Sequence, residues 1–140
     1  MALVLLAGIG LPSCSIAEDI ATVKVKNYKQ LIEAVSSGAT DITIDKNWQQ
    51  GTAEMRSNIY LENGTTVTIH GGTEETRLLK ATFDIYGRNG GGTLILDGID
   101  LEAMPDQPAM WVGGENAKVQ AGNLSGGKVT SGSGISVLIV

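Results

Sequence analysis

Short runs of alternating apolar and polar residues, separated by breaks that contain glycine, occupy most of this chain. The stretch GGGTLILDGIDLE at 90–102 shows the pattern most clearly. Its apolar positions are Leu94, Leu96, Ile99 and Leu101. Alternation predicts two short strands on either side of Asp97-Gly98, a pair that tolerates the positive φ angles of a tight bend. The bend is either the tip of a hairpin or the corner of a coil, and both interpretations bury Leu96 and Ile99 on one side.

Residues 27–38, NYKQLIEAVSSG, have the period of a helix instead. Asn27 is a good N-cap, Gln30 stands three residues later as in a capping box, and Gly38 suits a left-handed C-terminal position. The apolar positions, spaced i, i+3, i+4 and i+7, are Tyr28, Leu31, Ile32 and Val35. We therefore predict an amphipathic helix over about 27–37 that packs on another element.

The strand-like segments that run into glycine recur at similar intervals. DITID begins at 41, VTIHG at 67, LILDG at 94 and KVQAG at 118, which gives intervals of 26, 27 and 24 residues. Recurrence at 20 to 50 residues is typical of a solenoid. About this many residues suffice for one coil of three short strands joined by short loops.

A helix, an ITI-type strand, then NGTTVTIHGG and GGGTLILDGIDLE together resemble the start of a right-handed parallel β-helix of the pectate-lyase-like superfamily. The resemblance covers about residues 24–140 and is strongest to the non-enzymatic rungs of bacterial surface and adhesin-like proteins. It implies an all-β solenoid whose N-terminal helix covers the open end of the coil. The alternative is an antiparallel β-sandwich in which Asn63-Gly64 and Asp97-Gly98 are hairpin tips.

The first residues have the features of an export signal. An apolar run from Ala2 to Leu11 suits the hydrophobic region of a signal peptide, although no Lys or Arg precedes it. Two processing routes remain open: a lipobox-like sequence that ends at Cys14, the lipid-attachment residue, or cleavage after Ala17. We expect a leader over 1–17 and a secreted or cell-envelope protein, with an outer-membrane lipid anchor as the one route to a membrane.

The remaining 18–140 is expected to be one β-helix domain. The chain finishes on the apolar run ISVLIV without a polar closing segment, so we expect the domain to be incomplete at its C-terminus.

Composition excludes several classes of function. The net charge is −5, and the ten Lys and Arg are scattered, so no basic patch for nucleic acid is expected. The single cysteine rules out a disulfide scaffold within the chain. Nineteen glycines and 4% aromatic residues suit short aliphatic strands.

No catalytic or metal-binding motif emerges. His70 is the single histidine, which argues against a catalytic triad or a histidine metal cluster. The acidic residues Asp97, Asp100, Glu102 and Asp106 are interpreted as solvated turn residues rather than calcium ligands. Enzymes of the resembled superfamily combine carboxylates or calcium with a lysine or arginine, but no signature connects Lys80 or Arg88 to the acids. We expect no cofactor.

Four aromatic residues are candidates for stacking on sugar rings, namely Trp48, Tyr60, Tyr86 and Trp111. The leading hypothesis is a non-catalytic bacterial β-helix protein for adhesion or contact with glycans or a host or cell surface. One alternative is the N-terminal part of a polysaccharide lyase or glycoside hydrolase. The other is a carbohydrate-binding β-sandwich module.

Overall fold

The computed structural model describes residues 22–54, 57–125, 129–131 and 136–139, with side chains described as far as Gly122. These residues form mainly β-strands, together with helix α1 (Tyr28–Ser36) and the short 3-10 helix η2 (Thr52–Glu54). The strands are β1 (Val23–Val25), β2 (Asp41–Ile44), β3 (Trp48–Gln49), β4 (Asn58–Glu62), β5 (Thr66–His70), β6 (Leu78–Lys80), β7 (Phe83–Arg88), β8 (Thr93–Glu102), β9 (Met110–Gly114), β10 (Lys118–Ser125), β11 (Val129–Ser131) and β12 (Ser136–Ile139). The prediction of an all-β chain with one α-helix is confirmed for this part of the sequence.

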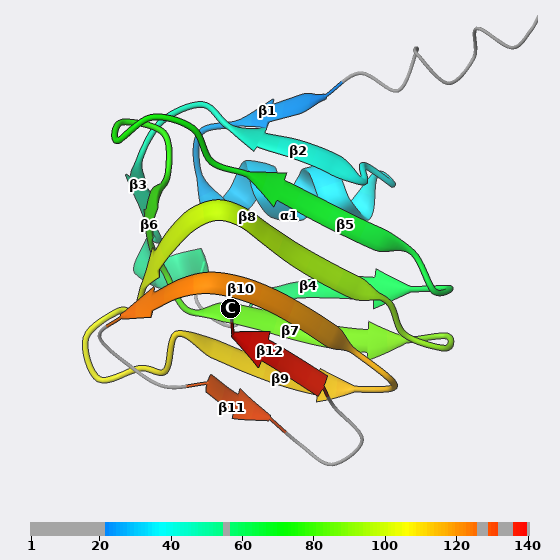
Figure 1. Ribbon diagram of the computed structural model, residues 1–140. Helices are drawn as coiled ribbons and strands as arrows, with labels where there is room; N and C mark the ends of the chain where they lie inside the picture. The colour runs from blue at the N-terminus through cyan, green and yellow to red at the C-terminus, as the bar shows by residue number, and fades with distance from the viewer. Residues whose placement is uncertain (1–21, 55–56, 126–128, 132–135, 140) are drawn as a thin grey trace, which may run out of the picture.

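The strands form two sheets that share one core (Figure 1). Sheet A has the order β1-β2-β5-β8-β10-β12, with β6 paired to both β3 and β8, and sheet B has the order β4-β7-β9-β11. From β2 onward the chain passes repeatedly through sheet A and then sheet B. We call each passage a circuit; the first four span residues 41–62, 66–88, 93–114 and 118–131.

Every ladder among the described strands is parallel, and the antiparallel β-sandwich alternative is therefore wrong. Asn63-Gly64 is not a hairpin tip, because it connects β4 of sheet B to β5 of sheet A. Asp97-Gly98 lies inside the long strand β8, whose first half pairs with β5 and whose second half pairs with β6. Gly98 adopts a positive φ of 66°, which bends the strand without ending it.

The bend in β8 leaves Leu96 and Ile99 both buried, as the hairpin and the coil interpretations each predict. The strand would normally alternate its side chains between two faces, but Asp97 and Gly98 are both exposed. The four apolar residues that flank them are buried, as predicted: Leu94, Leu96, Ile99 and Leu101.

Equivalent aliphatic residues of successive circuits stack in register. Ile42 pairs with Ile69, Ile69 with Leu96, and Leu96 with Ala121, and all four side chains are buried. The observed intervals are 27, 27 and 25 residues, so the predicted 26 and 24 were each one residue short. Alternation identifies the buried face, but the lengths of the intervening loops decide which residues lie opposite each other.

Helix α1 forms with the predicted caps. The Asn27 side chain accepts a hydrogen bond from the Gln30 amide at 2.8 Å, and the Gln30 side chain accepts one from the Lys26 amide. At the other end Gly38 has a φ of 93°, and the amides of Gly38 and Ala39 bond back to Val35 and Ala34. This is a Schellman arrangement.

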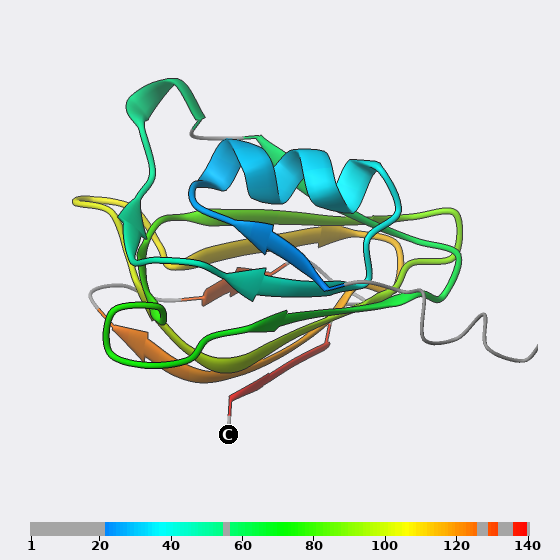
Figure 2. The same ribbon diagram turned by 90° about the horizontal axis from the view of Figure 1, so that it is seen from above.

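The apolar face of α1 packs beside β1 and over β4, the edge strand of sheet B (Figure 2). Tyr28 and Leu31 are fully buried, while Ile32 and Val35 are partly buried against the core. Beneath the helix, Tyr28 lies 5.6 Å from Phe83 and 6.1 Å from Trp48, measured between ring centroids.

The Tyr28 hydroxyl donates to the Ser57 carbonyl at 2.7 Å. Burial raises the pKa of this phenol, so it stays a neutral donor at physiological pH.

The corners that lead from sheet B to sheet A share an unusual backbone. Asn63, Asn89 and Asn116, one in the connection after each of the first three circuits, have positive φ angles of 57°, 52° and 44°. Asparagine tolerates this left-handed conformation better than most residues. The Asn63 amide donates to the Asn89 carbonyl at 3.2 Å, so adjacent corners are hydrogen-bonded to each other.

The predicted leader at 1–17 and its Cys14 lie outside the described residues. In the part of the chain that is described, no helix combines the length and apolar character needed to cross a membrane. At the other end, β12 pairs with β10 and extends sheet A.

Candidate functional site

The outer face of sheet B carries aromatic side chains on three neighbouring strands. Tyr60 of β4 is in register with Tyr86 of β7, and Tyr86 is in register with Gly113 of β9. Trp111 precedes Gly113 by two residues and therefore points to the same side of the sheet. We call Tyr60, Tyr86 and Trp111 the aromatic face.

Two members of the aromatic face are open to solvent. Tyr86 is 45% exposed and Trp111 is 47% exposed, which is unusual for such large side chains. Gly113, beside Tyr86, has no side chain that could cover the tyrosine ring. The spacing of neighbouring strands is about 4.8 Å, so the three strands present a surface roughly 10 Å wide.

Tyr60 contacts neighbouring side chains and is only partly exposed to solvent. The Arg88 guanidinium lies 3.8 Å from the centroid of the Tyr60 ring, a cation–π contact. The rings of Tyr60 and Tyr86 pack edge to face, with centroids 6.2 Å apart and an interplanar angle of 80°. The Tyr60 ring therefore packs against both Arg88 and Tyr86.

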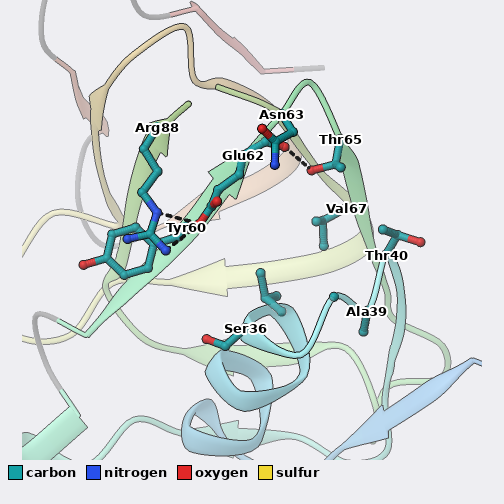
Figure 3. Close-up of a pocket in the computed structure, with 11 residues that line it drawn as sticks. Ser36, Ala39, Thr40, Tyr60, Glu62, Asn63, Thr65, Val67 and Arg88 are labelled. Atoms are coloured by element: carbon teal, nitrogen blue, oxygen red, sulfur yellow. Dashed lines mark hydrogen bonds and ion pairs between the residues drawn. The ribbon is translucent and has the colours of Figure 1, made fainter. Parts of the chain in front are cut away.

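Arg88 also forms an ion pair with Glu62 of the preceding circuit, through Nε and Nη2 at 2.5 Å from Oε1 (Figure 3). The Asn89 side-chain amide donates to the other Glu62 oxygen at 3.1 Å. Together these contacts lower the pKa of the Glu62 carboxyl, with the Arg88 hydrogen bond as the largest cause. The carboxylate is thus held ionised and oriented.

A pocket of about 270 Å³ opens between the end of α1 and this ion pair (Figure 3). On one side lie the last turn of the helix and its C-terminal loop, and on the other side lie β4, its corner and the start of β5. The lining residues are Val35, Ser36, Gly38, Ala39, Thr40, Tyr60, Glu62, Asn63, Thr65, Val67 and Arg88. The pocket therefore adjoins the aromatic face at Tyr60.

Replacing Arg88 with glutamine should raise the pKa of Glu62 toward 4.5, its ordinary value, as measured by NMR titration of the carboxyl carbon. The folded-state pKa is depressed, so the pair's contribution to stability is present above the unfolded-state value. It is lost as pH falls through the folded-state value. Because both side chains are exposed to solvent, the accompanying change in stability should be small.

Lys29→Gln is the matched control for this titration, because Lys29 pairs with Glu33 on helix α1. It should leave the pKa of Glu62 unchanged. An identical Glu62 titration in the wild type and in Arg88→Gln would contradict the assigned ion pair.

Trp48 does not belong to the aromatic face. It is 8% exposed and packs edge-on against Tyr28 in the core. Trp48 was a candidate for stacking on a sugar ring if it were exposed, but the residue is buried.

The acidic residues near 100 are paired across circuits. Asp97 lies 3.0 Å from His70, Asp100 lies 3.1 Å from Arg77, and Glu102 lies 4.0 Å from Lys80. All three acids belong to β8, so the interpretation of them as turn residues is wrong, whereas Asp106 does lie in a loop. Such exposed cross-strand pairs each stabilise a sheet by less than about 1 kcal/mol.

His70 lies between two carboxylates on the outer face of sheet A. Its Nε2 is 3.2 Å from Asp41 and its Nδ1 is 3.0 Å from Asp97, so it connects three strands. Within the residues that the structure describes, no group of three or more His, Cys, Asp or Glu could hold a metal ion. The absence of catalytic residues and cofactors remains a prediction.

From the sequence, Arg88 stood out only as a cation near acidic residues, and neither Glu62 nor Gly113 stood out at all. The sequence did contain a signal for the Glu62–Arg88 pair, since these residues are 26 apart, which is close to the repeat interval. Comparison of the chain with protein-family models, with curated proteins and with solved structures finds no match.

Proposed function

We propose that the chain is a right-handed parallel β-helix that serves, without catalysis, as a secreted or cell-envelope protein that contacts glycans through the aromatic face. The parallel ladders and the alternation between the sheets support the β-helix. Each early circuit supplies three strands, as β5, β6 and β7 do in the second circuit. The right-handed sense follows the strong preference of parallel crossover connections.

The observation that carries the glycan proposal is the exposure of Tyr86 and Trp111 on one face of sheet B. Aromatic rings bury the apolar faces of sugars well, and a rigid sheet fixes the rings before binding. The neighbouring Glu62 and Arg88 supply a hydrogen-bond acceptor and donors at the edge of this surface. Secretion or attachment to the envelope rests on the expected leader over 1–17.

The tryptophan fluorescence of a Trp48→Phe variant tests this function, because Trp111 is then the single tryptophan. A titration with soluble polysaccharides should change the emission of Trp111. Tyr86→Ala should weaken binding by about 3- to 10-fold, the loss expected for one aromatic contact. Circular dichroism checks that each variant is folded.

Val23→Ala is the matched control, since Val23 is exposed but lies on β1 of sheet A. It should bind as the wild type does. If no polysaccharide changes the emission of Trp111, and affinity electrophoresis detects no binding by the wild type, the aromatic face is not a glycan site.

A further inference from the structure

We infer that the aromatic face selects neutral sugar chains over acidic ones; this inference rests on the proposed glycan contact. The site would take a polysaccharide of uncharged sugars, with hydroxyl groups held by the Glu62–Arg88 pair and ring faces stacked on Tyr86 and Trp111. The distribution of charge around these rings supports this selectivity.

Arg88 is the one cationic residue of β4, β7 and β9. Its guanidinium is already bound to Glu62 and lies over the Tyr60 ring. A carboxylate or sulfate on a sugar would have to displace Glu62 to bind Nε and Nη2 together, the two donors that Glu62 already occupies. The displaced Glu62 would then lose the contacts that keep it ionised.

The connection after β9 adds a second carboxylate near this site. Gly114 is the register partner of Gly87, and Glu115 follows it with its backbone amide bonded to the Gly87 carbonyl at 2.8 Å. The Glu115 carboxylate accepts a hydrogen bond at 3.0 Å from the backbone amide of Gly90, two residues after Arg88, so two carboxylates accompany one guanidinium. The local balance is one negative charge, which repels an acidic sugar chain.

The same arrangement suits sugar hydroxyls. A carboxylate is an acceptor with two oxygens, and a guanidinium offers several donors in one plane, so the pair can bind neighbouring hydroxyl groups that both donate and accept. The adjoining pocket of about 270 Å³ is slightly smaller than the roughly 300 Å³ at which pockets for drug-sized ligands begin. The terminal sugar residue of a chain that lies on the aromatic face would meet this pocket at Tyr60.

The test compares polysaccharides that share a backbone but differ in charge. Hydroxyethylcellulose and carboxymethylcellulose form one pair, and dextran and carboxymethyl dextran form a second. With the Trp48→Phe variant in about 20 mM salt, the neutral member should bind at least about 5-fold more tightly. The difference should shrink at about 0.5 M salt, because exposed charges are then screened.

Glu62→Gln frees the Arg88 guanidinium and should bring the affinities for the two members within about threefold of each other. The matched control is Glu33→Gln, which removes the same charge from helix α1 and should keep the preference. An acidic member that binds the parent variant as tightly as its neutral partner would overturn the inference while leaving the glycan proposal intact. Failure of all four polysaccharides to bind would remove the glycan proposal and this inference with it.

Discussion

Replacing Phe83 with alanine is expected to lower the free energy of unfolding by about 3–5 kcal/mol. Phe83 is fully buried and lies against the Tyr28 ring under helix α1. Its removal leaves a cavity where the helix, β3 and β7 meet. Equilibrium unfolding in urea, followed by circular dichroism, measures the loss.

Tyr86→Ala is the matched control, since it removes an aromatic ring from the same strand but from the exposed face. It should cost less than about 1 kcal/mol, mainly through its edge contact with Tyr60. If both variants lost equal stability, the core would not lie on the Phe83 side of β7.

Gly87→Ala is expected to cost about 3 kcal/mol, at the upper end of the range for overpacking. A Cβ atom at Gly87 would overlap the carbonyl oxygen of Glu115, the residue that follows β9 of the next circuit. The obstacle is backbone on both sides, so a change of side-chain rotamer cannot relieve it. Urea unfolding measures this effect as well.

Gly122→Ala is the control for that substitution, because an added Cβ there meets nothing within 4 Å and the residue also lies in a strand. Its stability should change by less than about 1 kcal/mol. A Gly87→Ala variant as stable as Gly122→Ala would show that neighbouring circuits do not approach as closely as this register requires.

The buried face of an alternating strand such as β2 could be predicted from the sequence, because alternation determines it. Ile42 and Ile44 of β2 are both buried, as their spacing indicates. The register between circuits could not be predicted to the residue. It depends on bulges and bends such as the one at Gly98, which local composition does not reveal.

The exposure of the aromatic residues could be predicted only partly from the sequence. Trp111 lies between the buried residues Met110 and Val112, so alternation places it outside. Trp48 lies between Asn47 and Gln49, where no alternating pattern indicates a face. Its burial comes from tertiary contact with Tyr28, which is distant in sequence.

Buried polar residues at the corners were also beyond prediction. The Gln50 side chain is almost fully buried, donates to the Thr82 carbonyl and accepts from the Thr82 amide. Composition suggests an exposed glutamine at such a position. Only the next circuit supplies the backbone groups that make its burial favourable.

The asparagine corners make the two edges of the fold unequal as sites for engineering. Connections from sheet B to sheet A are short, at 63–65, 89–92 and 115–117, and successive corners bond to each other. Connections at 71–77 and 103–109 are longer. Foreign loops, affinity tags or new chain termini should therefore be accepted at 104–107. The 71–77 connection is less suitable because it is hydrogen-bonded to Asn47 and Asp97 of neighbouring circuits, and an added residue at an asparagine corner would disturb the bonds between successive corners.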